Sequence, residues 1–449
     1  MRNIGKYIVQ GRIGRGGMST VYKARAPITA RTVAIKILQP RDDIFIELVG
    51  EEGLRKMFLE EARLMGEISH DHVAKILDCD ENDGSPFIVL EYFAHSIGSL
   101  IGETYLMDKP SRVISVNKAY RYIRQALHGL QRLHFAGIIH RDIKPYNLMI
   151  TNDDRIKIID FGLSRVRGEE KTAIPGLQVG SPYYAAPEQE KEPKNADERA
   201  DLFSVGIMAY RLVTGRLVSH KQHISPPSSF NPDLDSEWDD FLLKSISRDT
   251  RQRFQSALEM RQHLDELYTG WVRRSKNDCT YMAQDPVKIQ PIPRFLRSRP
   301  VFILHKQLQK EYDLDSLMRP KNYSSHRFEI RDNNLLACLD TGQLWQRQGA
   351  GFPLTWNKAH EYIDYLNSRQ WQGYTHWRLP TTEELGSLLR PPTSMRDFCF
   401  ASYFSQEIHW LWSSDTCTRQ KAWVVDIQES YFQELDKDGM ASVCGVVSG

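Results

Sequence analysis

Acidic and amide side chains about a third of the way along the chain have the spacing that phosphoryl transfer requires. Residues 140–147 read HRDIKPYN, and residues 158–162 read IIDFG. Phosphoryl transfer needs an acid that accepts the proton of the attacking hydroxyl, and oxygen ligands that hold Mg²⁺ against the phosphates. We predict Asp142 as the base, with Asn147 and Asp160 as magnesium ligands. An aspartate turn or an asparagine cap would explain each residue singly, but their joint occurrence favours the chemistry.

A glycine-rich segment near the N-terminus predicts contact with phosphates. Residues 14–21 read GRGGMSTV and lie between two predicted strands. Glycine lets the backbone approach a phosphate closely and point its N–H groups at it. A hairpin turn that needs glycine only for a positive φ angle is the alternative, and it would be preferred if the segment stood alone.

A lysine and a glutamate form the next expected pair. Lys36 ends the VAIK run of a predicted strand over 32–38, from which its side chain can reach back under the glycine-rich segment. A lysine that pairs α- and β-phosphates has to be held by a carboxylate on the following helix. Glu61 is the preferred partner, and Glu60 is the alternative.

The elements that must position these residues form two regions. Residues 7–92 read as strands around one helix, with the helix predicted over 55–68. The strands are expected over 7–13, 20–24, 32–38 and 87–92. From 115 to 135, apolar residues recur at helical spacing, and further helical stretches run to about residue 268. A small sheet with one helix is therefore followed by a mainly helical region.

With these motifs, residues 7–268 resemble a bacterial eukaryotic-type Ser/Thr protein kinase. Three further segments carry the resemblance: APE at 186–188, DLFSVG at 201–206 and RDTRQR at 248–253. The resemblance implies an α+β fold class, with a bilobal protein kinase domain over 1–268 whose N-lobe covers 1–92 and whose C-lobe covers 93–268. It also implies ATP as the phosphoryl donor, Mg²⁺ as the metal, and serine or threonine hydroxyls of proteins as acceptors.

The same resemblance assigns roles to the site residues. Lys36 would contact the α- and β-phosphates, Glu61 would orient Lys36, and Lys144 would lie near the γ-phosphate. Together with Asp142 these residues form the expected catalytic set. Nucleotide contacts are expected from the glycine-rich segment, the strand after it, the hinge and the magnesium site: Ile13, Gly14, Arg15, Gly16, Gly17, Val21, Ala34, Lys36, Leu90, Glu91, Tyr92 and Asn147. Ser19 stands where the kinase pattern has its third glycine.

Further implications concern specificity and the C-lobe. Glu188 should pair with Arg253 inside the C-lobe. Lys144, two residues after the base, together with Ser181 resembles the pattern of Ser/Thr rather than Tyr kinases. Every catalytic position is filled, which argues against an inactive pseudokinase.

A phosphorylation site is expected in the segment that follows the second magnesium ligand. Residues 163–180 contain two hydroxyl side chains, Ser164 and Thr172, and Ser164 lies too near Asp160 to act as a mobile switch. Arg141 directly precedes the base, and in such kinases this arginine commonly binds a phosphorylated residue. Autophosphorylation at Thr172 is therefore the hypothesis, and an ordinary solvated threonine is the alternative.

The C-terminal part carries a second pattern after a predicted basic, proline-containing linker over 269–326. Segments LDTGQLWQ at 339–346, WRLPT at 377–381 and AWVVD at 422–426 are its clearest motifs. Residues 327–449 resemble the Lcl C-terminal-like domain family, which has a C-type-lectin-like α+β fold related to formylglycine-generating enzymes. The tryptophans are expected mainly in the core. Glu383 and Glu384 are expected to cap a helix. The basic residues of the linker could dock a partner or pack on a domain.

Composition restricts the remaining functions. The formal net charge is +2, which gives no global indication of nucleic-acid binding, and no segment has the length of apolar residues that a membrane span requires. The six cysteines include no CxxC pair, so neither a zinc site nor a disulfide framework is expected. We predict a cytoplasmic protein kinase whose partners are protein substrates and an unknown ligand of a C-terminal recognition or sensory domain. The alternative is a nucleotide-binding scaffold that works mainly through that domain.

Overall fold

The computed structural model describes most of the chain, with several internal gaps. The described residues are 3–40, 46–47, 49–104, 109–160, 165–166, 183–191, 196–218, 224–277, 289–290, 296–391, 404 and 409–448. The chain divides into two compact units: Met1–Val113 with Ala119–Asn277, and Ile114–Lys118 with Asp278–Gly449.

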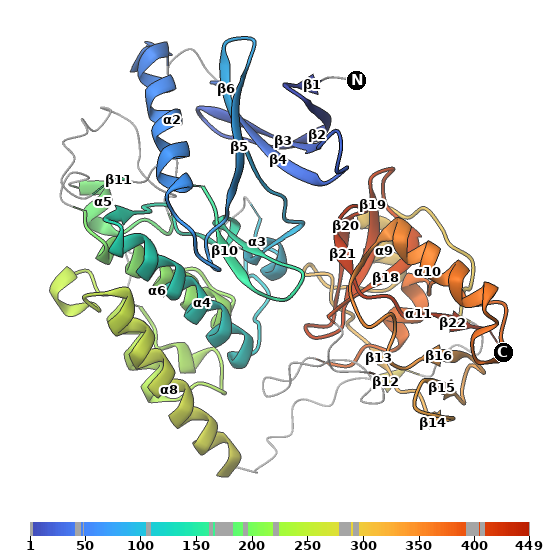
Figure 1. The fold of residues 1–449 in the computed structure, drawn as a ribbon. Coiled ribbons are helices and arrows are strands. Elements are labelled where there is room, and N and C mark those ends of the chain that lie inside the picture. Colours follow the sequence, from blue (N-terminus) through green and yellow to red (C-terminus); the bar gives the residue numbers. More distant parts are fainter. Residues whose placement is uncertain are drawn as a thin grey trace. The chain divides into compact units, whose positions relative to one another are not determined.

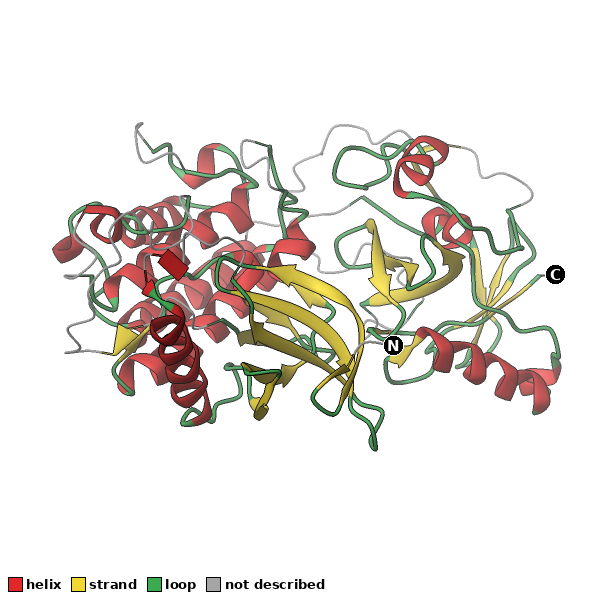
Figure 2. Cartoon of the chain, turned by 90° about the horizontal axis from the view of Figure 1, so that it is seen from above, coloured by secondary structure: helices red, strands yellow, loops and turns green. Residues whose placement is uncertain are grey.

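An antiparallel sheet and one helix form the N-terminal lobe of the first unit. The sheet has the order β1-β2-β3-β4-β6-β5. Its strands are β1 (Asn3–Ile4), β2 (Tyr7–Arg15), β3 (Ser19–Arg25), β4 (Thr32–Leu38), β5 (Ile76–Asn82) and β6 (Ser85–Glu91). Helix α2 (Glu51–Gly66) packs on it, with Phe58 and Ala62 clustered against Ile88 of β6. Figure 2 shows the sheet as a curved array of strands with the helices of the same unit gathered on one side.

The four predicted strands and the predicted helix of this lobe are confirmed, but β5 was not expected. Strand β5 contains Asp78, Asp80 and Glu81, and most of its side chains are exposed. It lies at the edge of the sheet, where β6 is the one described strand that pairs with it. A polar edge strand lacks the apolar alternation from which strands are predicted, and charged side chains also discourage pairing with other chains.

Helices dominate the second lobe of this unit, as predicted. Its elements are α3 (Ile97–Ile101), α4 (Val116–Phe135), α5 (Pro187–Lys191), α6 (Arg199–Thr214), α7 (Ser236–Ser245) and α8 (Ala257–Asn277), with the short strands β7 (His95–Ser96), β8 (Ile138–Ile139), β9 (Leu148–Ile150), β10 (Ile156–Ile158) and β11 (Arg165–Val166) (Figure 1). Helix α6 is buried from Ala200 to Thr214. Gly206 allows α7 to approach it, because a Cβ there would lie 2.7 Å from the Cβ of Ser245. Helix α8 continues through residue 268 to Asn277.

The second unit is rich in short strands. Three sheets contain most of them: β14 (Phe328–Ile330), β15 (Leu335–Cys338), β16 (Leu344–Gln346) and β22 (Val446–Val447); β17 (Leu354–Thr355) and β21 (Met440–Ala441); β18 (Trp410–Thr416), β19 (Lys421–Asp426) and β20 (Tyr431–Asp436). A fourth, parallel pair joins β12 (Ile289–Gln290) to β13 (Tyr323–Ser324). Helices α9 (His305–Glu311), α10 (Trp356–Ser368) and α11 (Thr382–Ser387) complete the unit.

Tryptophans fill the core of this unit, as expected. Trp345, Trp412 and Trp423 are fully buried. Two of them keep their indole N–H satisfied, since Trp412 donates to the carbonyl of Leu354 at 2.7 Å and Trp423 to that of Ile303 at 3.0 Å. The predicted helix cap is also present, because the Thr381 hydroxyl accepts from the backbone of Glu384 while the Glu384 carboxylate accepts from that of Thr381.

Residues 296–326, expected as part of the linker, belong to the folded second unit. Ile303, Leu308 and Leu314 are buried in its core. Arg297, expected on a basic linker, donates from both terminal nitrogens to the carboxylate of Asp415 at 2.9 and 2.8 Å. The linker was predicted from the prolines and charges of this segment. Its widely spaced apolar residues nevertheless pack it into the core of the second unit.

Candidate active site

A buried lysine connects the two lobes of the first unit. Lys36 of β4 donates from Nζ to Oε1 of Glu61 at 2.7 Å and to Oδ1 of Asp160 at 2.8 Å. Burial alone would lower the pKa of Lys36, but the charges of Asp160 and Glu61 and their hydrogen bonds raise it above its ordinary value. The lysine is therefore a fixed cation, held in place by the helix acid that the sequence favoured. Glu60, the alternative, is not its hydrogen-bond partner.

The predicted base lies between two other predicted site residues. Oδ2 of Asp142 accepts from Nζ of Lys144 at 2.6 Å and from Nδ2 of Asn147 at 3.0 Å. Nδ2 of Asn147 also donates to the backbone carbonyl of Asp142 at 2.8 Å. The carbonyl oxygen of the Asn147 amide, which is the atom type that Mg²⁺ takes, is used in neither bond.

Backbone hydrogen bonds join the segment of the base to that of Asp160. Ile159 donates from its backbone to the carbonyl of Asn147 at 3.0 Å. The ring of His140 contacts the carbonyl of Ile159 at 3.0 Å. Asp160 itself has φ of 66°, in the left-handed region that few non-glycine residues adopt. These contacts join the segment that carries Asp142 and Asn147 to the residue directly before Asp160.

Asp201 at the start of α6 is hydrogen-bonded to the segment of the base, a role that the sequence motifs did not predict. It is fully buried. Its Oδ1 accepts from the backbone of Arg141 at 2.7 Å, and its Oδ2 from the backbone of His140 at 2.9 Å. Arg141 has φ of 67°, a strained value that these bonds maintain. Burial would raise the pKa of Asp201, but the hydrogen bond and charge of His134 and the contacts of His140 lower it.

The glycine-rich segment forms the β2–β3 hairpin. Gly14 pairs with Val21, and the backbone of Gly16 donates to the carbonyl of Ser19 at 2.8 Å. Gly14, Gly16 and Gly17 do not have positive φ angles. A Cβ added to Gly14 would meet no atom within 4 Å. The conformation of the hairpin therefore does not require these glycines, which disfavours the hairpin-turn alternative and fits the close approach of a ligand.

The expected gatekeeper and hinge residues, Leu90, Glu91 and Tyr92, begin inside the end of β6. Ala34 of β4 pairs with Leu90 and Val33 pairs with Glu91. The Glu91 carboxylate contacts Nζ of Lys157 at 3.0 Å, and Nζ of Lys23 lies 5.5 Å from the centre of the Tyr92 ring. Ile13 and Arg15 flank Gly14 on β2.

The pairing expected within the C-lobe is confirmed. Arg253 donates from its two terminal nitrogens to the two carboxylate oxygens of Glu188, at 2.5 and 2.9 Å. The Arg253 side chain is fully buried. The phosphorylation candidate Thr172 lies outside the described residues, as do Ser164, Ser181 and residues 161–162.

Comparison with known proteins agrees with this geometry. Residues 7–264 match the protein kinase domain, and residues 338–446 match the Lcl C-terminal domain. The chain belongs to the protein kinase family. Members of this family generally use ATP and Mg²⁺.

Bacterial Ser/Thr kinases are among its relatives. A "probable serine/threonine-protein kinase" of Clostridium acetobutylicum is 30% identical over 298 residues, which cover 64% of this chain and 43% of the relative. The serine/threonine-protein kinase PksC of Streptomyces coelicolor is 33% identical over 276 residues, which cover 57% of this chain and 48% of the relative. The "probable serine/threonine-protein kinase PknB" of Corynebacterium glutamicum is 31% identical over 310 residues, covering 64% and 45%. The chain thus spans less than half the length of these relatives.

Across the residues that the structure describes, none of the helices combines the length and the apolar character needed to cross a bilayer.

Proposed function

We propose that this chain is an active Ser/Thr protein kinase that transfers the γ-phosphate of ATP to protein hydroxyls. The observation that carries the proposal is the convergence of the two lobes on one site, in which Lys36 contacts both Glu61 and Asp160 at hydrogen-bonding distance. A second group of contacts surrounds the predicted base, since Lys144 and Asn147 both donate hydrogen bonds to the carboxylate of Asp142. All the charged and amide groups that phosphoryl transfer requires are present.

In the proposed mechanism, each residue has one task. Lys36 neutralises the α- and β-phosphates, and Glu61 fixes its position. Asp142 accepts the proton of the substrate hydroxyl, and Lys144 lies close enough to Asp142 to reach the transferred phosphate. Asn147 and Asp160 would hold Mg²⁺, which when bound neutralises charge on the phosphate oxygens. The backbone of the β2–β3 hairpin covers the nucleotide.

Regulation and location complete the proposal. Autophosphorylation at Thr172 would supply a phosphate that pairs with Arg141. Phosphosite mapping of the active protein should find Thr172 modified, and an active sample with unmodified Thr172 would remove this part. The cytoplasm is the proposed compartment because it supplies ATP. The Lcl C-terminal domain is proposed as a recognition module of C-type-lectin-like fold, with a ligand still to be identified.

The test is phosphate transfer from radiolabelled ATP to the protein itself and to casein or myelin basic protein. Lys36→Met should remove at least about 99% of the transfer, since the loss of one charge-stabilising contact to the phosphates costs roughly 10²-fold or more. Lys75→Met is the matched control, because this exposed lysine uses only its backbone N–H in a contact with Glu91. Full transfer by Lys36→Met would refute the proposed mechanism. Absent transfer by the wild-type chain that still binds ATP would favour a nucleotide-binding scaffold.

A further inference from the structure

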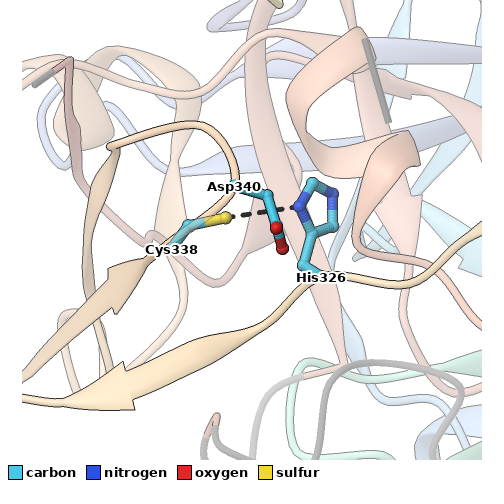
Figure 3. Close-up of side chains that lie close together, drawn as sticks. All are labelled: His326, Cys338 and Asp340. Atoms are coloured by element: carbon cyan, nitrogen blue, oxygen red, sulfur yellow. Dashed lines mark hydrogen bonds between the residues drawn. The ribbon is translucent and has the colours of Figure 1, made fainter. Parts of the chain in front are cut away.

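Three side chains with metal-binding atoms meet in the second unit, and none of them belongs to the phosphoryl-transfer site. His326 precedes β14, Cys338 ends β15, and Asp340 lies in the turn after it. One ligand atom from each of the three lies within 4.8 Å of those from the other two. Figure 3 shows the imidazole, the thiol and the carboxylate pointing toward one another, with Nδ1 of His326 hydrogen-bonded to Sγ of Cys338 at 3.3 Å.

The backbone around this group is well defined by hydrogen bonds. Cys338 pairs with Phe328 in the β14–β15 hairpin. Leu339 donates to the carbonyl of Arg327 at 2.9 Å, and Gly342 to that of Cys338 at 2.9 Å. The three side chains are therefore held by a paired hairpin and a tight turn. A metal site on paired strands needs less rearrangement on binding than one on separate loops.

The hydrogen bonds of His326 determine which ring nitrogen carries the proton. The Ser387 hydroxyl donates to the carbonyl of Glu384 at 2.7 Å, so its proton is used there. Nε2 of His326 lies 3.0 Å from the same hydroxyl oxygen and must act as the donor to it. A neutral imidazole that donates from Nε2 carries its lone pair on Nδ1. That lone pair is directed at Cys338, as in metal-ligating histidines whose other nitrogen donates to the protein.

The backbone and side chain of Arg327 both donate hydrogen bonds to Asp340. Its Oδ2 accepts from the backbone of Arg327 at 2.6 Å, and its Oδ1 from the Arg327 guanidinium at 2.8 and 2.7 Å. Each carboxylate oxygen has more than one lone pair, so these bonds fix the carboxylate without using all its acceptor capacity. The Asp340 side chain is 18% exposed, whereas Cys338 and His326 are buried. Solvent can thus reach the group from the aspartate side.

We propose that His326, Cys338 and Asp340 form a binding site for a borderline-soft divalent cation of the Zn²⁺ type. The ligands would be Nδ1, Sγ and one carboxylate oxygen, with a water as fourth ligand on the exposed side. Nitrogen, thiolate and carboxylate together are a ligand set typical of Zn²⁺, with metal–ligand distances of about 2.0 to 2.3 Å. Two such bonds at a tetrahedral angle separate sulfur and nitrogen by roughly 3.5 Å, close to the observed Sγ–Nδ1 distance of 3.3 Å.

Binding would exchange one proton for the cation. The Cys338 S–H bond breaks, the thiolate and Nδ1 each form a bond to the metal, and the thiol proton leaves to solvent. The expectation that the chain has no zinc site rested on the missing CxxC pair. In this group His326 precedes the first strand of a hairpin, Cys338 ends the second strand, and Asp340 lies in the following turn, a spacing that no local cysteine motif describes.

The test is titration of the full chain, freed of metal with a chelator, with CoCl₂ and then with ZnSO₄ as competitor. Co²⁺ bound to Cys338 should give a thiolate-to-cobalt charge-transfer band and the intense visible bands of a tetrahedral site, and ZnSO₄ should abolish both. The charge-transfer band separates this site from the acid and amide ligands of the phosphoryl-transfer site, which contain no sulfur. Release of one proton per cation, measured in weak buffer, is the independent readout.

Variants decide the assignment. Cys338→Ser should lose the charge-transfer band, whereas Cys417→Ser, which changes another buried thiol of the same unit, should keep it. Arg327→Ala removes only the exposed guanidinium that donates to Asp340 and should weaken cobalt binding about 10- to 100-fold. Arg331→Ala, another exposed arginine nearby, should leave the affinity unchanged.

These outcomes support or overturn the site even if Cys338→Ser fails to fold. The Arg327→Ala and Arg331→Ala pair then decides, because both substitutions lie on exposed side chains. Wild-type chain without a charge-transfer band at saturating CoCl₂ would overturn the proposal. It would show that Cys338 and His326 form only a buried S–H to nitrogen hydrogen bond.

Discussion

Replacing Asp201 with asparagine should slow phosphoryl transfer, although Asp201 is placed to contact neither nucleotide nor substrate. Its two carboxylate oxygens accept the backbone N–H groups of Arg141 and His140, the two residues before the base. An amide has one carbonyl oxygen, so in either orientation its NH₂ group faces one of these N–H groups. The variant thus loses a charge-assisted hydrogen bond and leaves a buried donor unsatisfied, which costs about 2 to 4 kcal/mol.

The strained backbone of Arg141 links the lost hydrogen bond to the position of the catalytic base. Its φ of 67° is maintained by the bond to Asp201, and the peptide that follows positions Asp142. If the segment relaxes, the base is misplaced in the transition state, and 2 to 4 kcal/mol corresponds to a fall in kcat of roughly 30-fold to 1000-fold. The KM for ATP should change little, because Lys36 and Glu61 lie on other elements.

The assay is steady-state phosphate transfer to casein, with kcat and KM for ATP determined separately. Asp239→Asn is the matched control, since Asp239 caps a turn in the same lobe by accepting from the backbone and hydroxyl of Ser228 at 2.8 and 2.6 Å. Both variants should lose stability in urea, but only Asp201→Asn should lose kcat. Equal kcat values for Asp201→Asn and the wild type, or equal losses in both variants, would refute the positioning role.

Three further predictions concern other parts of the chain. Gly14→Ala should leave the free energy of unfolding unchanged or raise it by up to about 1 kcal/mol, because a methyl group there meets open space, but it should raise the KM for ATP. The control Gly66→Ala, where a methyl group also meets open space, should leave the KM for ATP unchanged. An unchanged KM in Gly14→Ala would contradict a close approach of the nucleotide at this glycine. Arg253→Met should destabilise the first unit by about 3 to 5 kcal/mol in urea unfolding, because it leaves Glu188 without its buried partner. Arg251→Met, which changes an exposed arginine, should alter the free energy of unfolding little. Similar losses in both variants would contradict a special contribution of the buried pair. Burial would raise the pKa of Asp415, but hydrogen bonds from Arg297 and Thr382 lower it, so its stabilisation of the second unit should be complete above the unfolded pKa of about 3.9 and be lost as pH falls through the lower folded value. Acid unfolding should therefore have a shallower pH dependence in Asp415→Asn, and an unchanged slope would show that Asp415 does not contribute.

Local motifs made most of the site predictable from the sequence. The run around Asp142 and the strand carrying Lys36 require particular residue types at fixed short spacings, so their roles could be predicted without a fold. The choice of Glu61 over Glu60 also agrees with the structure, because it is Glu61 that reaches Lys36 across 25 positions of sequence. The described residues do not include Thr172, and its phosphorylation stays a prediction.

Features that depend on long-range packing were not predictable in the same way. Asp201 reaches His140 and Arg141 from about 60 residues away, so no local spacing reveals its task. The segment 296–326 was predicted as a linker because it contains prolines and no regular apolar pattern. Its part in the core depends on Leu308 and other apolar residues that lie far apart in the sequence. Strand pairing and a turn bring His326, Cys338 and Asp340 together, and a cysteine-pair motif does not describe such a group.

The most direct test of the central claim compares ATP binding and phosphate transfer in Asp142→Asn and in the wild type. Asp153→Asn, at an exposed turn between β9 and β10, is the control. We expect all three proteins to bind ATP with Mg²⁺ alike, while transfer falls by roughly 10² to 10⁴ in Asp142→Asn alone. Transfer by Asp142→Asn at the wild-type rate would contradict the assignment of the base and, with it, the proposed kinase mechanism.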